Sequence, residues 1–130
     1  MPRGNPSQGG DARPGRSKAY RLSGPGAFEA LFRNGRRREG EYLQLVYAPA
    51  GTLPGRVGFV LARKALPLAV DRNRVRRMLR ERIRAARPAI EAYDLIVRLR
   101  RGCPRSAFRA VADEAERMLA ELCPRRPNEA

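Results

Sequence analysis

The segment Arg72–Arg84 restricts the fold of this chain more than any other, because only one side of it can be buried. Its apolar residues recur at steps of three and four, which is the spacing of one face of a helix. This apolar face consists of Val75, Met78, Leu79, Ile83 and Ala86. Arginines and Asn73 occupy the neighbouring face, and Pro88 ends the pattern. The sequence therefore predicts an amphipathic helix with an arginine stripe beside its buried stripe.

The segment around this helix carries a large excess of positive charge. Between residues 63 and 84 there are nine lysines and arginines but only two acidic residues. Solvated helical faces usually pair opposite charges four residues apart, whereas the arginines at 72, 76, 80 and 84 repel one another. A phosphate backbone would relieve this repulsion on binding. The stripe thus favours a nucleic-acid partner, with an ordinary solvated helix face as the alternative.

The chain as a whole is strongly basic. Its 130 residues include 28 lysines and arginines against 13 acidic residues, which gives a net charge of +15 and a pI near 11.5. Such an excess favours a polyanionic partner. Only Lys18 and Lys64 are lysines, and the guanidinium group of arginine can bind a phosphate through two hydrogen bonds. A GC-rich genome would explain the preference for arginine equally well, but not the excess of positive charge.

Several kinds of chemistry lack their usual residues. The chain contains no histidine, so it has neither the commonest general base nor an imidazole metal ligand. Cys103 and Cys123 are too few and too far apart for a zinc site, and we interpret them as small thiols that are buried or half-buried. No 18-residue apolar run and no apolar stretch after the N-terminal arginines appear, so we expect neither a membrane span nor a signal peptide. We therefore expect a cytoplasmic protein without a membrane partner, a catalytic residue or a metal site.

Composition predicts one folded domain between two tails. Residues 1–18 are rich in Gly, Pro, Arg and Ser and contain almost nothing apolar, so we expect a disordered basic tail. Residues 124–130 have the same character. The periodic apolar pattern lies between them, at residues 19–123, and a chain of this length supports one core.

The rest of the domain alternates helical and strand patterns. Ser23 is a candidate N-cap for a first helix, with Pro25 in its first turn and Gly35 just past its end. Strands are predicted where β-branched and aromatic residues gather, and a final helix where apolar residues recur at helical spacing. The predicted strands are 42–47, 56–62 and 94–101, and the final helix is 106–122.

One string in the middle of the chain resembles the signature of the bacterial ribonuclease P protein component. It comprises Arg56-Val57-Gly58-Phe59, then Lys64, then Ala69-Val70-Asp71-Arg72-Asn73-Arg74-Val75-Arg76-Arg77, and finally Arg80-Glu81. Its core, Arg-Asn-x-x-(Lys/Arg)-Arg-x-x-Arg-Glu, is quite specific, and Phe28-x-x-x-Phe32 followed by Gly35 resembles the first helix of the family. The resemblance covers about residues 20–122. It departs from the family at Ala65–Leu68, a connector that is one residue longer and contains Pro67.

The resemblance implies both a fold and a function. The fold would be α/β, an α+β sandwich of element order α-β-β-(β)-α-β-α, with a central mixed sheet and a left-handed βαβ crossover. The function would be that of the protein subunit of ribonuclease P, which binds the catalytic RNA subunit and the 5′ leader of precursor tRNA. Hydrolysis would belong to the RNA subunit and use magnesium, so no catalytic residue, protein metal site or small-molecule substrate is expected.

The resemblance also assigns roles to individual residues. The predicted contacts to the RNA subunit are Arg72, Asn73, Arg74, Arg76, Arg77, Arg80 and Arg84, with Arg82 as a weaker candidate. The predicted leader-binding cleft consists of Phe28, Phe32, Tyr42, Val46, Arg63 and Lys64. The two phenylalanines could instead be ordinary core residues, and Arg63 and Lys64 a solvated strand end. Tyr42 and Val46 are expected on one strand face, but the sequence does not say which face lines the cleft.

Other classes of protein share parts of this pattern. A ribosomal or other structural RNA-binding protein would have the same charge and the same arginine helix, although not the 72–81 signature. A DNA-binding helix protein would need a paired helix before the basic one or a heptad repeat for dimerisation. An autonomous metal nuclease would need two carboxylates spaced to hold a metal pair, and none are apparent.

Overall fold

The computed structural model describes residues 21–22 and 24–123. The tails predicted at 1–18 and 124–130 lie outside these residues. The fold is built on a four-stranded mixed sheet whose strands follow the spatial order β1-β2-β4-β3. The strands are β1 (Arg36–Glu39), β2 (Leu43–Pro49), β3 (Val57–Val60) and β4 (Tyr93–Leu99). β2 pairs antiparallel with β1 and β4, whereas β3 pairs parallel with β4.

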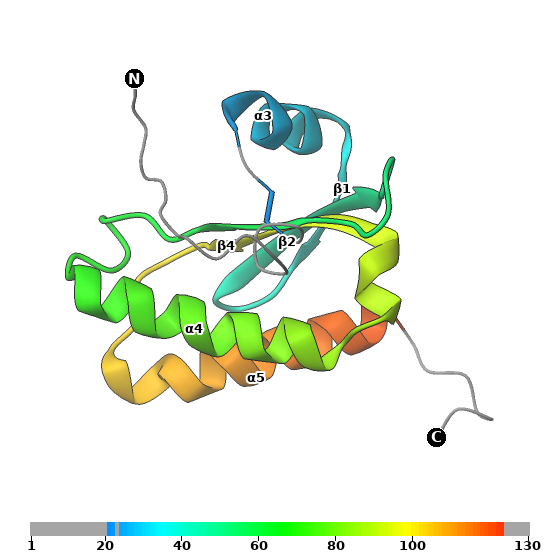
Figure 1. Ribbon diagram of the computed structural model, residues 1–130. Coiled ribbons are helices and arrows are strands. Elements are labelled where there is room, and N and C mark those ends of the chain that lie inside the picture. Colours follow the sequence, from blue (N-terminus) through cyan, green and yellow to red (C-terminus); the bar gives the residue numbers. More distant parts are fainter. Residues whose placement is uncertain (1–20, 23, 124–130) are drawn as a thin grey trace, which may run out of the picture.

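Helices cover both faces of this sheet (Figure 1). α3 (Pro25–Asn34) lies on one face, and α4 (Ala69–Ala85) and α5 (Phe108–Leu122) lie side by side on the other. Two short 3₁₀ turns, Ala89–Ala92 and Arg105–Ala107, lead into β4 and α5. α4 connects the parallel neighbours β3 and β4, which is the βαβ crossover expected from the resemblance. The predicted α+β architecture with a mixed sheet is confirmed.

The sheet separates two apolar clusters because neighbouring residues of a strand point to opposite faces. The larger cluster joins Leu45 and Val97 to the buried stripes of α4 and α5. The smaller cluster joins Val46 and Ile96 to Leu31 of α3. The apolar residues at helical spacing in the last helix are all buried: Phe108, Val111, Ala115, Met118, Leu119 and Leu122. On α4, Val75, Leu79 and Ile83 are buried. Met78 of the same helix and Ala86, just past its end, pack against the same cluster.

Three local predictions need correction. Gly24 rather than Ser23 is the N-cap of α3, and its φ of 91° explains why a glycine is present there; Ser23 lies outside the described residues. α4 begins at Ala69, three residues before the predicted start, and no side chain caps it. Arg36–Glu39, which carries no apolar residue, forms the edge strand β1 through its antiparallel pairing with β2.

Gly35 ends α3, as predicted, and its lack of a side chain has a packing reason. Its backbone is extended rather than left-handed. A β-carbon at this position would approach the carbonyl oxygens of Leu31 and Tyr47 to 2.7 and 3.0 Å. The close approach lets the chain turn directly from the helix into β1.

Within the described residues no helix is long and apolar enough to cross a membrane.

Candidate nucleic-acid interface

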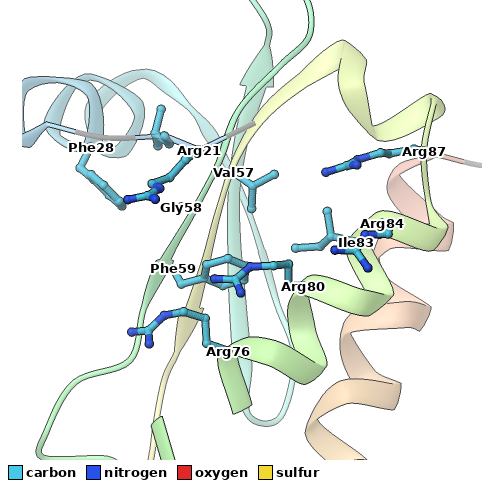
Figure 2. A pocket seen from close by; sticks show the side chains of 11 residues that line it. Arg21, Phe28, Val57, Gly58, Phe59, Arg76, Arg80, Ile83, Arg84 and Arg87 are labelled. Atoms are coloured by element: carbon cyan, nitrogen blue, oxygen red, sulfur yellow. The ribbon is translucent and has the colours of Figure 1, made fainter. Parts of the chain in front are cut away.

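A cleft of about 900 Å³ runs along the free edge of β3, between α3 on one side and α4 on the other. Figure 2 shows side chains from both helices and from β3 facing this space. Apolar and aromatic residues form its floor, and guanidinium groups form much of its walls. The lining residues are Arg21, Leu22, Phe28, Val57, Gly58, Phe59, Arg76, Arg80, Ile83, Arg84 and Arg87.

The helical repeat explains which arginines of α4 reach the cleft. Arg76, Arg80 and Arg84 follow one another at steps of four, so they form one row beside the buried stripe. Ile83 belongs to the buried stripe and also reaches the cleft. Arg87, just past the end of the helix, extends the row. A single helix thus supplies both the anchor in the core and the charged wall.

The charge of the cleft has one sign, since five of its lining residues are arginines and none is acidic. Burial lowers the pKa of Arg80, and the neighbouring charges of Arg76 and Arg21 lower it further. The guanidinium carbon of Arg80 lies 5.9 Å from the centre of the Phe59 ring, a cation–π arrangement. Crowded and partly desolvated cations of this kind are stabilised when an anion enters the cleft.

Phe28 reaches the cleft because a glycine faces it. A β-carbon on Gly58 would come within 2.5 Å of the Phe28 ring and 3.3 Å of the Leu22 β-carbon. The ring therefore lies directly on the backbone of β3. Next to it, the Leu22 N–H donates a hydrogen bond to the Val57 carbonyl at 2.8 Å, which places Arg21 beside the strand edge. The backbone hydrogen bond is possible because β3 is the edge of the sheet, whereas the Phe28 ring contacts the face of the strand that α3 covers.

Two other residues of the signature make contacts within the chain. The Arg72 guanidinium donates hydrogen bonds to the carbonyls of Leu66 and Pro67 at 2.8 and 3.0 Å, so it holds the connector that precedes α4. Asn73 accepts a hydrogen bond of 2.9 Å from Arg76. Arg74 and Arg77 are exposed on the outer side of α4 and do not line the cleft. The predicted RNA-binding set therefore divides between the cleft and the outer surface.

Arg82 points away from the cleft. It donates hydrogen bonds of 2.7 and 2.8 Å to Asp113 and Glu116 of α5. The hydrogen bond from Arg82 lowers the pKa of Asp113, and the same bond raises the pKa of Arg82. This residue, the weaker candidate of the signature helix, joins α4 to α5.

The structure does not bring the predicted leader-binding residues into one cleft. Phe28 lines it, whereas Phe32 is half-buried against the cluster beneath α3. Arg63 and Lys64 are exposed beyond the end of β3 and do not line it.

The expectation that Tyr42 and Val46 share one strand face is wrong. Val46 has no exposed surface and belongs to the cluster under α3. Tyr42 precedes β2 and packs against the opposite cluster, with the Arg101 guanidinium 5.1 Å from its ring centre. The strand begins one residue later than predicted, so the alternation of faces does not extend back to Tyr42.

Arg21, Phe59 and Arg87 line the cleft but were not predicted as site residues. Arg87 could have been found by continuing the arginine row of α4 three residues past Arg84. Phe59 lies in the string that resembles the family signature, but its pattern did not mark it as a site residue, because a short apolar strand is compatible with burial of both faces. Arg21 reaches the site only through its pairing with β3.

Neither metal ligation nor thiol chemistry is supported within the described residues. These residues contain no group of three or more histidine, cysteine or acidic side chains that could hold a metal ion. Burial raises the pKa of both cysteine thiols, and the charge of Asp71 raises that of Cys103 further. Thiols with raised pKa values are poor nucleophiles, in agreement with their interpretation as half-buried packing residues.

Comparison with known proteins gives one consistent result. The family model described as "Ribonuclease P" matches residues 17–123. The ribonuclease P protein component of Azoarcus sp. strain BH72 is 41% identical over 81 residues, which are 62% of this chain and 68% of that protein. Its counterpart in Chloroflexus aurantiacus is 35% identical over 108 residues, or 82% and 79% of the two chains.

Solved structures show the same fold. A mutant RNase P protein of Staphylococcus aureus, described as defective in mRNA degradation activity, superposes with a TM-score of 0.67 at 21% identity. The match covers 82% of this chain and 89% of that one. The RNase P protein of Thermotoga maritima gives a TM-score of 0.56 at 24% identity and covers 76% and 90% of the two chains.

Proposed function

The chain belongs to the ribonuclease P protein family, and we propose that it binds the catalytic RNA subunit along α4 and the 5′ leader of precursor tRNA in the cleft beside β3. Members of this family are protein components of an endoribonuclease that acts in tRNA 5′-end maturation. The partners of this chain are then the RNA subunit of ribonuclease P and its precursor tRNA substrate. We expect the complex in the cytoplasm.

One observation carries the proposal: five arginines and two phenylalanine rings line the cleft without a single acidic residue. Guanidinium groups neutralise phosphates, and aromatic rings stack on unpaired bases whatever the base. The distal edge of the half-buried Phe28 ring lies against Gly58, so the protein already holds the ring in place at the cleft. A single-stranded leader needs this combination of charge and stacking surface, whereas a regular duplex does not expose its bases in this way.

The division of the arginines on α4 suggests two contact surfaces. Arg76, Arg80 and Arg84 line the cleft, where leader phosphates would lie. Arg74 and Arg77 are exposed and do not line the cleft, and we place the RNA subunit on this side of the helix. Asn73 is exposed as well and accepts a hydrogen bond from Arg76, so it lies beside the cleft row. Arg72 would support this surface by holding the connector through its hydrogen bonds to Leu66 and Pro67.

We place no step of the hydrolysis on the protein. We expect magnesium to be held by the RNA subunit and the substrate, since the part of the chain that the structure describes brings together no set of metal-ligating side chains. The protein would contribute affinity and position, because a leader bound in the cleft is held in one orientation relative to the catalytic RNA.

Cleavage of precursor tRNA tests the proposal. Protein alone, its cognate ribonuclease P RNA alone, and both together are mixed with precursor tRNA at a low magnesium concentration. We expect the protein alone to leave the substrate intact and the mixture to cleave faster than the RNA alone. Arg109→Ala with Arg117→Ala, two exposed arginines of α5, is the matched control and is expected to retain the effect. Equal cleavage with and without the protein would refute the proposal.

A further inference from the structure

A row of polar side chains crosses the sheet on the face that carries α3. Strand pairing aligns Gln44 with Glu39 of β1 and with Arg98 of β4, and Arg98 in turn with Val60 of β3. The row next to it contains Val46 and Ile96, which are fully buried in the cluster under α3. Residues two apart on a strand face the same side, so the polar row lies on the α3 face of the sheet, one step beyond the buried row.

Hydrogen bonds fix the orientation of the central amide in this row. The Gln44 Nε2 group donates to Glu39 Oε2 at 3.0 Å, and its Oε1 atom accepts from Arg98 Nη1 at 3.1 Å. Gln44 is only 7% exposed, and buried amides keep the orientation that satisfies their partners. The carboxylate of Glu39 thereby turns the amide oxygen towards Arg98.

The Arg98 side chain is held by one hydrogen bond and is otherwise exposed to solvent. Its side chain is exposed, and its bond to Gln44 uses only one of the five N–H donors of a guanidinium group. Among residues 21–22 and 24–123 it forms no ion pair, unlike Arg100 and Arg101, which pair with Glu39 and Glu41. An arginine held through a neutral amide keeps its full positive charge for an external partner.

The position of Arg98 connects it to the cleft. Val60, its neighbour across the strand pair, lies two residues after Gly58, the residue on which the Phe28 ring rests. Two residues of a strand span about 6.6 Å. A single strand stacked on Phe28 and continuing along β3 would therefore bring its next nucleotide over Val60 and Arg98.

We propose that Arg98, positioned by Gln44 and Glu39, binds a leader nucleotide next to the one that stacks on Phe28. The free edge of its guanidinium donates two hydrogen bonds to a pair of acceptors. Such a pair is offered by two oxygens of one phosphate or by N7 and O6 of a guanine. This inference rests on the proposed binding of the leader in the cleft and extends the leader site across the sheet.

Equilibrium titration of the protein–RNA holoenzyme with precursor tRNA tests this assignment. Arg98→Ala is expected to weaken binding of a substrate with a long leader about tenfold and to leave mature tRNA and the RNA subunit unaffected. Arg117→Ala, which removes the same charge from α5, is the matched control and is expected to change none of the three affinities. Folding is checked by the melting temperature, which an exposed side chain should barely affect.

The role of Gln44 is tested separately. Gln44→Met keeps the volume and removes the acceptor that orients Arg98, so it should weaken leader binding by less than Arg98→Ala does. In the double variant the two losses should not add, because the second residue acts through the first. Additive losses would show that Gln44 does not position Arg98.

Chemically altered leaders distinguish the two sources of the acceptor pair. If a phosphate is bound, an uncharged methylphosphonate at one leader position weakens the wild type and not Arg98→Ala. If a guanine is bound, 7-deazaguanine at one leader position weakens binding to the wild type and not to Arg98→Ala. Wild type and Arg98→Ala then bind a leader without guanine with equal affinity. Equal affinity of Arg98→Ala and wild type for every leader would overturn the inference. If Phe28→Ala in that case still weakens leader-bearing precursor tRNA more than mature tRNA, the proposed binding of the leader in the cleft is supported and only the role of Arg98 is wrong. If Phe28→Ala shows no leader-specific loss of affinity either, the proposed binding of the leader in the cleft is also wrong.

Discussion

Helices α4 and α5 pack side by side on the same face of the sheet, yet they use their charges in opposite ways. α4 carries seven arginines and two acidic residues, whereas α5 carries two arginines and four acidic residues. The carboxylates of α5 have partners within the chain. Arg82 forms ion pairs with Asp113 and Glu116. Glu114, which is only 4% exposed, accepts hydrogen bonds from the backbone N–H groups of Tyr42 and Leu43.

Within residues 21–22 and 24–123, the arginines of α4 that line the cleft form no ion pair with a carboxylate. The pKa of Arg80 is lowered by burial and by the charges of Arg76 and Arg21, which means that folding brings like charges together at a cost. A sequence under selection for stability alone would place acidic residues there. The comparison shows that charge count by itself does not identify a binding surface. A row of arginines that forms no ion pair within the part of the chain that the structure describes, as at Arg76, Arg80 and Arg84, is the more informative sign.

The largest expected effect comes from replacing two cleft arginines of α4 by alanine, and the same replacement of two arginines of α5 serves as the comparison. Arg76→Ala with Arg80→Ala should lower the affinity for leader-bearing precursor tRNA by about 1.5–3 kcal/mol for each charged hydrogen bond that is well desolvated, and by less where it is exposed. Arg109→Ala with Arg117→Ala removes the same charge from α5 and should have little effect. Both pairs are measured by equilibrium titration after circular dichroism has shown that the variants fold. Equal losses would mean that only net charge matters, and the contrast between the helices would disappear.

A second, smaller effect concerns the aromatic floor of the cleft. Phe28→Ala removes a stacking surface and should weaken leader-bearing precursor tRNA by about 1–3 kcal/mol relative to mature tRNA. Affinity for the RNA subunit should not change. The matched control is Phe32→Ala, whose ring is half-buried under α3 but does not line the cleft, so its leader-specific loss should be smaller. If Phe28→Ala simply unfolds the protein, as its melting temperature would show, the residue belongs to the core and not to the leader site.

The same contrast explains how much could be predicted from sequence. The helices and their buried faces follow from local periodicity, and Val75, Leu79 and Ile83 lie where that pattern places them. The signature Arg72–Glu81 identified the family, and its row of arginines does line a cleft. Both kinds of information are local in the chain. For that reason they were available before any tertiary contact was known.

The remaining features depend on contacts between distant segments. Arg82 lies on a different side of α4 from Arg80, but its ion pairs form because Asp113 and Glu116, on another helix, lie within reach of it. The edge strand β1 has no apolar residue and forms because β2 offers it a partner. Val46 is a core residue and not a cleft residue, because α3 covers its face of the sheet. Strand order and helix placement determine these outcomes, and a single sequence does not display them.

Salt dependence provides a third test of the contrast. For roughly six phosphate contacts, the slope of log affinity against log salt concentration should be steeper than about −4. The Arg76/Arg80 alanine pair should reduce this slope by about 1.4, since each contact to a single strand contributes about 0.7, and the Arg109/Arg117 pair should leave it unchanged. Titrations at several salt concentrations measure both slopes. A nearly flat response of the wild type would contradict the electrostatic basis of the interface.

The smallest effect belongs to the contact between the two helices. The hydrogen bond from Arg82 lowers the pKa of Asp113 in the folded state, so the pair stabilises the fold above the ordinary carboxyl pKa of about 4 and loses that contribution as the pH falls further. Asp113→Asn should therefore lower the melting temperature slightly at neutral pH, and the difference from wild type should vanish in acid. Because both groups are at least partly exposed to solvent, the loss stays small. RNA affinity at neutral pH should not fall, since Arg82 faces α5 and the cleft arginines are untouched. Melting curves between pH 7 and pH 2.5 follow the first effect and RNA titration the second. A clear loss of RNA affinity in Asp113→Asn would mean that α5 takes part in binding and that the two helices do not divide their roles.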